Sequence, residues 1–188
     1  MFQRLFRSDR ATNRAITEGL YAEIVAAARQ PLFYSDWGVP DTPLGRFEMI
    51  SLHMVLALRR MKKGGAELDE IAQAVTDHFF LEVDHSLREL GVGDVGVPKR
   101  MKRLAKMFYG RAGAYSTEIE AGNASGLAAA FERNVWPQGA ETADPAALAA
   151  YAIRVADELD RQPVSNWRAG EAVFPSVEDL ESSDGRNA

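Results

Sequence analysis

The sequence contains no cysteine, and its uncharged apolar runs are short. The lack of cysteine excludes disulfides, thiolate nucleophiles, and zinc or iron–sulfur sites built on cysteine. A membrane-spanning helix needs roughly 20 predominantly apolar residues, and no run reaches that length, so we predict no transmembrane segment. The first ten residues alternate apolar and charged side chains, unlike the apolar stretch of a signal peptide. These absences favour a cytoplasmic protein and leave contact with a membrane surface open.

Alternation of apolar and polar residues, the mark of β-strands, is also missing, and the spacing of apolar residues is helical almost throughout. The sequence has 188 residues, enough for one domain with a sizeable core. We predict a single all-α domain, a bundle of six or seven helices. The expected long helices span about 13–29, 43–63, 67–90, 98–121, 124–135 and 145–162.

The chain divides into three predicted parts: a basic segment at 1–12, a helical domain at 13–175 and an acidic, disordered tail at 176–188. In the first segment apolar residues interleave with Arg4, Arg7 and Arg10. Two readings stay open for it, a short amphipathic foot on an anionic membrane and a frayed terminus.

The helix expected at 43–63 is apolar on most sides, so we predict that it is central. Its predicted buried residues are Phe47, Ile50, Met54 and Leu58. We also expect Trp37, between a helix ended by proline and one started by proline, to be mostly buried against this helix. Methionines at helical spacing could line an adaptable surface, although core positions are the commoner outcome.

A concentrated basic stretch stands out in a chain of net charge -5. It follows a glycine-rich turn and the helix start at Pro98, and no acid interrupts it. Apolar residues at helical spacing take the core side, so we expect the cations on the outer side, facing a polyanionic partner. The predicted partner-binding residues are Lys99, Arg100, Lys102, Arg103 and Lys106.

Three polar residues, His78, Glu82 and His85, share one face of a predicted helix and could ligate a metal. We favour a solvated polar face, because no Glu-x-x-His pair on another helix completes a di-iron site. His53 is expected to be a hydrogen-bonded histidine of the core or its edge rather than a base. We therefore predict no metal, no cofactor and no catalytic residue.

Gly91-x-Gly93-x-x-Gly96 has the spacing of a dinucleotide-binding loop. It follows a predicted helix instead of a strand, so the required context is absent. A helix–helix turn is the better interpretation, and an anion at the start of the basic helix is the alternative.

Three stretches resemble the ubiquinol–cytochrome c chaperone family, the assembly factors for cytochrome b of respiratory complex III. They are YSDWGVPDTPLGRFEMISLH, HFFLEVDHSLRELGVGDVGVPKRMKRLAKMFYGRAGAY and FERNV. The resemblance covers roughly Tyr21 to Val135, and the short N-terminus is more similar to bacterial members. The residues matched to the family motifs are Trp37, Asp41, Arg46, Glu48, Asp84, Arg88, Glu89 and Asp94.

The resemblance implies a chaperone without catalytic activity that binds newly made cytochrome b and aids biogenesis of the ubiquinol–cytochrome c reductase complex. It implies that the protein acts beside the ribosome surface or at the periphery of the inner membrane, and that it does not bind DNA. Two alternatives come from the residues alone: a basic-helix module that binds anionic membrane or RNA without a client, and a helical metalloprotein.

Overall fold

The computed structural model describes residues 2–179, and side chains within that range from residue 12 onward except at 67. It contains eight helices there and no β-strand, which confirms the predicted all-α bundle. They are α1 Phe2–Ala28, α2 Pro31–Ser35, α3 Pro43–Lys63, α4 Ala66–Glu89, α5 Val97–Glu120, α6 Ala124–Val135, α7 Pro145–Arg161 and α8 Val164–Ala169. Six of these match the predicted long helices, and the short α2 and α8 were not predicted as helices.

Helix α3 is the centre of the bundle, as predicted. Fourteen of its 21 residues are buried, and it packs against α1, α4, α5, α6 and α7. The Thr42 side chain caps it by accepting a hydrogen bond from the Gly45 amide at 3.1 Å. A Cβ at position 45 would lie 1.9 Å from the Pro40 carbonyl oxygen, so the entry turn requires glycine there.

Two of the four side chains predicted to be buried on α3 are fully so, Phe47 and Met54. Ile50 and Leu58 are half-buried and pack against the core from its edge. The prediction was too strong for these two because α3 is apolar on almost every side, so periodicity alone does not separate core from edge.

Trp37 is half-buried, which corrects the expectation of near-complete burial against α3. Its ring lies 5.4 Å from that of Phe33 in α2 and 5.9 Å from that of Tyr151 in α7. The Trp37 carbonyl also accepts a hydrogen bond from the Asp144 amide. The aromatic loop therefore closes onto the start of α7, a neighbour that is more than 100 residues away in sequence.

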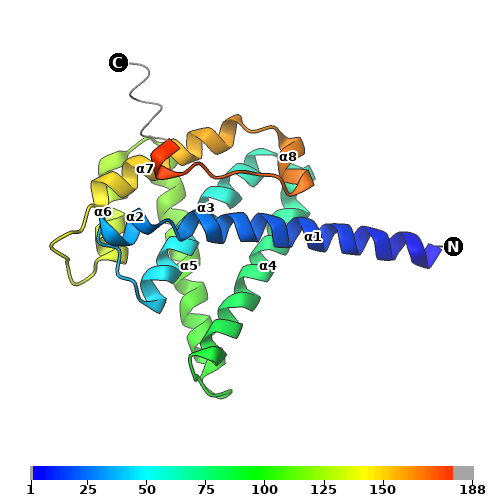
Figure 1. Cartoon of the computed structure of the whole chain (residues 1–188), viewed down its shortest axis with the longest axis horizontal. Coiled ribbons are helices and arrows are strands. Elements are labelled where there is room, and N and C mark those ends of the chain that lie inside the picture. The colour runs from blue at the N-terminus through cyan, green and yellow to red at the C-terminus, as the bar shows by residue number, and fades with distance from the viewer. Residues whose placement is uncertain (1, 180–188) are drawn as a thin grey trace.

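The two ends of the described chain differ from the expected helix limits. Helix α1 begins at Phe2 rather than near Asn13, and in Figure 1 it runs past the body of the bundle. Val177 is buried, and its amide donates to the Gln30 side chain at 2.8 Å. The division at residues 12 and 175 stays a prediction, since the tail from 180 to 188 lies outside the described residues.

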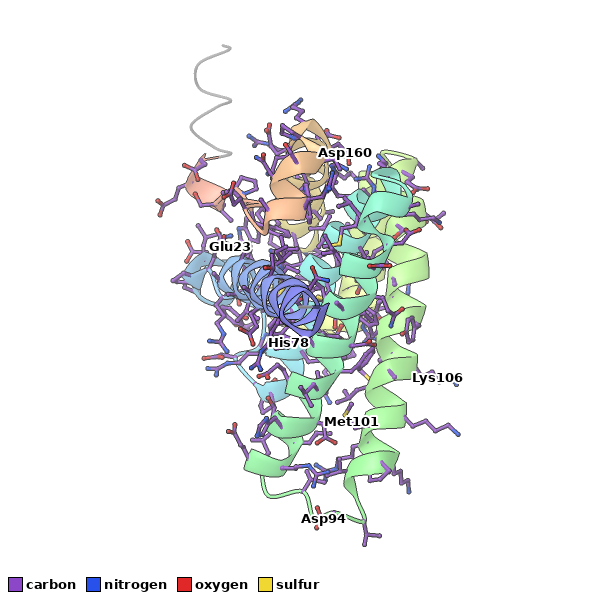
Figure 2. All side chains as sticks on the ribbon, turned by 90° about the vertical axis from the view of Figure 1, so that its right-hand side faces the viewer. Glu23, His78, Asp94, Met101, Lys106 and Asp160 are labelled. Atoms are coloured by element: carbon purple, nitrogen blue, oxygen red, sulfur yellow. The ribbon has the colours of Figure 1, made fainter. Side chains whose placement is uncertain are left out.

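Helices α4 and α5 form an antiparallel hairpin that projects from the body of the bundle (Figure 1). Near the body of the bundle, Phe79 of α4 stacks on Phe47 of α3 and also packs against Phe108 of α5. Figure 2 shows Asp94 at the far end of the projection, in the turn that joins the two helices. We call α4, α5 and the turn between them the hairpin.

Candidate partner-binding surface

The outer side of α5 carries the cations that the sequence singled out. Phe108 and Tyr115 of the same helix are buried, and Leu104 is half-buried, so the core side of α5 is apolar. In Figure 2 the Lys106 side chain points away from the bundle. All five predicted cations are exposed, and we call them the basic flank: Lys99, Arg100, Lys102, Arg103 and Lys106.

None of these five cations forms an ion pair with any side chain that the structure describes. The sequence holds no acid between Asp94 and Glu118, so α5 itself supplies no counter-charge over this length. Several of the cations are three or four residues apart and therefore neighbours on the helix surface. The flank presents an uncompensated positive field to the solvent.

An ion pair inside the bundle fixes α5 to α3. The Arg111 guanidinium donates through Nε and Nη2 to the two carboxylate oxygens of Glu48, with Nη2 2.5 Å from Oε1. The Glu48 side chain is only 2% exposed and that of Arg111 11%. Burial raises the pKa of the Glu48 carboxyl above its ordinary value, although Arg111 acts against that rise.

Arg111 is a structurally important residue that the sequence reasoning missed. It lies three residues after Phe108 and four before Tyr115, so helical spacing puts it on the buried side of α5. A cation at a core position needs a buried acid as its partner. Glu48, which was singled out only through the family motif, is a charged residue at a core position on α3. The position of Arg111 on the apolar side of α5 could therefore have predicted a buried ion pair.

Three further acids matched to the family motif, Asp41, Asp84 and Asp94, are paired with nearby arginines, whereas Glu89 is exposed and has no ion pair among the described side chains. Asp41 accepts a hydrogen bond from Arg46 at 2.6 Å across the first turn of α3, and this bond lowers the pKa of the Asp41 carboxyl. Arg88 donates to Asp84 at 2.7 Å and also to Asp94. These pairs are exposed and contribute little to stability. The Arg88–Asp94 pair ties the turn between α4 and α5 to the end of α4.

The glycine pattern Gly91-x-Gly93-x-x-Gly96 forms the turn between α4 and α5. Only Gly91 of the three has a positive φ, +79°, where it ends α4. Since the turn follows a helix, the dinucleotide-binding interpretation fails, and the helix–helix turn is the observed structure.

The metal alternative has no geometric support in the described residues, where no three His, Asp or Glu side chains lie close enough to hold an ion. The His78 ring meets the edge of Tyr21 of α1 at 4.8 Å, whereas His85 is exposed. His78 and His85, which were predicted to share one face of the helix, therefore lie in different environments.

His53 is completely buried and belongs to a hydrogen-bonded chain in the core. Its Nδ1 lies 2.8 Å from the Met49 carbonyl and must donate, so Nε2 accepts from the Tyr151 hydroxyl at 2.9 Å. The Gln30 amide donates to that hydroxyl at 3.3 Å. Burial lowers the pKa of His53 to about 4, so the ring is neutral near pH 7.

The methionines do not form one adaptable surface. Met49, Met54 and Met61 have no solvent exposure and belong to the core, while Met101 and Met107 are half-buried on α5. In the described part of the chain, no helix has the length and apolar character to cross a bilayer.

These features define the class of protein: a helical bundle whose distinctive surface is an exposed basic face, with buried polar groups that hold the bundle together. A family model described as ubiquinol–cytochrome C chaperone matches residues 35–174. The chain belongs to this family, which supports a role in the assembly of complex III. The matched region extends beyond Val135, where the resemblance ended, and includes α7 and α8.

A solved structure agrees with this assignment. The crystal structure of the Cbp3 homolog from Brucella abortus is 49% identical in sequence and superposes with a TM-score of 0.85. The match covers 95% of this chain and 98% of that one, so both chains share nearly their whole length. No curated protein matches the sequence.

Proposed function

We propose that this protein binds newly made cytochrome b and holds it during assembly of the ubiquinol–cytochrome c reductase complex. The family supports the assembly role. The observation that carries the proposal is the basic flank, five exposed cations with no acid beside them on a protein of net charge -5. Such a face fits an anionic partner at the site where a membrane protein is synthesised.

The proposal makes the protein a binder rather than an enzyme. The chain has no cysteine, and its one buried histidine is held by Met49 and Tyr151 inside the core. The expected place of action is the cytoplasmic surface of the inner membrane, beside the ribosome.

Affinity capture from the native membrane fraction tests the client. We expect cytochrome b to be recovered with the wild-type protein. We expect the variant Lys99→Glu, Lys102→Glu, Lys106→Glu to lose it without any fall in melting temperature. A matched control reverses three exposed cations outside α5, with Arg29→Glu, Lys62→Glu and Arg133→Glu. Recovery of cytochrome b should survive in the control.

Two results would contradict the proposal. If wild-type protein never recovers cytochrome b, the client is a different one. If the triple α5 variant supports normal levels of assembled ubiquinol–cytochrome c reductase, the basic flank is only a solvated helix face.

A further inference from the structure

Exposed apolar side chains gather on the hairpin. Six large hydrophobic side chains are exposed in the described part of the chain, and four of them, Leu81, Leu90, Val95 and Tyr109, lie on α4, α5 or their turn. The other two, Leu44 and Val173, are on separate parts of the bundle. The concentration coincides with the element that carries the basic flank.

Two of the four side chains lie at the projecting end. Val95, in the turn, is 96% exposed, and Leu90, at the C-terminal cap of α4, is 59% exposed. The acid of this turn, Asp94, is held by Arg88. The end of the hairpin therefore presents aliphatic groups beside two exposed acids, Asp94, which is paired with Arg88, and Glu89. We call Leu90 and Val95 the apolar tip.

The basic flank begins just behind the apolar tip. Lys99 follows Val95 by four residues, and the rise from Lys99 to Lys102 along α5 is only about 4.5 Å. The polar layer of one bilayer leaflet is roughly 5–7 Å thick. A hairpin that meets a bilayer end-on would put the apolar tip near the base of the headgroups while the first cations of the flank lie among the phosphates.

We propose that the end of the α4–α5 hairpin docks on the surface of an anionic phospholipid bilayer. The apolar tip enters the interfacial layer, and the basic flank binds lipid phosphates. This inference deepens the proposed function by naming the anionic partner, and it predicts peripheral contact without a spanning segment.

The apolar tip favours a bilayer over RNA. Phosphates of either partner satisfy cations, but single-stranded RNA binds apolar side chains chiefly through stacking on aromatic rings. The apolar tip has aliphatic groups without a planar face. Their contribution to binding is favourable only where they are removed from water. An interfacial layer offers that transfer together with the phosphates.

Co-sedimentation of the purified full chain with vesicles tests the inference. The probes are vesicles of phosphatidylcholine alone and of phosphatidylcholine with phosphatidylglycerol. We expect binding only to the anionic vesicles. Partitioning should fall about tenfold in Leu90→Ser, Val95→Ser, and on the order of 100-fold in Lys99→Gln, Lys102→Gln, Lys106→Gln. The matched control, Leu44→Ser with Val173→Ser, removes exposed apolar groups elsewhere and should bind as wild type does.

Because the chain has no cysteine, a single introduced thiol can carry an environment-sensitive dye. The Val95→Cys protein should show a blue shift when anionic vesicles are added, and the Val173→Cys protein should not. Together these two labels report which end of the molecule meets the lipid.

Three outcomes would overturn the inference. The first is unchanged vesicle binding by the variant with serines at the apolar tip. The second is charge-dependent binding to ribosomal RNA with none to vesicles. The third is vesicle binding that Arg4→Gln, Arg7→Gln, Arg10→Gln abolishes while the hairpin variants retain it. None of these assays contains cytochrome b, so their failure leaves client capture as a separate question, and the reverse also holds.

Discussion

The cations at the end of α3 and those on α5 have the same chemistry and opposite surroundings. Arg59 donates twice to Asp160 of α7, at 3.0 and 3.2 Å, and Lys63 donates to the same carboxylate at 2.6 Å. Arg60 binds the backbone carbonyls of Leu159 and Gln162. The five cations of the basic flank have no such acceptor among the described side chains.

The cations of α3 have partners within the bundle, and those of the basic flank have none among the described side chains. Burial opposes ionisation of Asp160, but hydrogen bonds from Lys63 and Arg59 outweigh it and hold the pKa of that carboxyl below its ordinary value. These cations join α3 to α7. The five cations of the basic flank form no ion pair with any described side chain. They also repel one another, because several are three or four residues apart, and this repulsion lowers the stability of the helix. The absence of a partner among the described side chains supports the proposed contact with an anionic partner outside the bundle.

Breaking the ion pair between α3 and α5 should give the largest effect. Glu48→Ala leaves the Arg111 guanidinium charged and largely buried without its carboxylate partner, with only the Met107 carbonyl as an acceptor. This loss costs about 3–5 kcal/mol of unfolding free energy. Urea denaturation measures it. The control is Glu120→Ala, an exposed acid on α5, the helix that carries Arg111; it should change stability by less than about 0.5 kcal/mol.

The paired replacement Glu48→Leu with Arg111→Met separates the pair from its packing. It should recover most of the lost stability, because an apolar pair of similar volume avoids the buried charge. Equal instability of the paired and single variants would show that the geometry of the ion pair, rather than its uncompensated charge, holds α5 in position.

The buried histidine should make stability depend on pH below neutrality. The pKa of His53 falls from 6.5 to about 4 on folding. Between these two pH values the imidazole is mostly protonated in the unfolded chain and mostly neutral in the folded one. Stability is complete above pH 6.5 and falls by about 3 kcal/mol as the pH drops toward 4. Measurement needs urea midpoints across that window for wild type and His53→Gln.

The other titrating groups are common to both proteins in that comparison, so the difference between their profiles isolates His53. The gap in stability should shrink as the pH falls, because only the wild type loses this contribution. Parallel profiles would mean that the imidazole accepts a proton inside the core at its ordinary pKa.

Trp37→Ala should have an intermediate effect. The ring packs on Phe33 and Tyr151 but remains half exposed, so we expect a loss of about 2–3 kcal/mol, below the 3–5 typical of a fully buried tryptophan. A thermal melt checks the size. A change of only a degree or two would show that the aromatic loop contributes to a surface and not to the bundle.

The sequence predicted the long helices because capping residues, prolines and apolar spacing agree at each one. Thr42 and Asp144, each followed by a proline, cap α3 and α7. The exposure of the basic flank also followed from helical geometry. The partners of Trp37 and Arg59 could not be predicted, because Tyr151 and Asp160 approach them only when α7 folds back across about 100 residues. Which apolar side chains of α3 reach the edge, as Ile50 and Leu58 do, depends on neighbours in the same way.

The smallest expected effect has the opposite sign. In Lys99→Gln, Lys102→Gln, Lys106→Gln the repulsion between cations three and four residues apart is reduced, as is the unfavourable charge of Lys99 in the first turn of α5. Unfolding free energy should therefore rise by about 1 kcal/mol at low salt and return to the wild-type value in high salt. Urea denaturation at two salt concentrations measures this. A loss of stability would mean that these lysines hold the hairpin together, and the contrast with the cations of α3 would disappear. A gain, combined with lost binding, would show that the bundle gives up stability to keep a charged face.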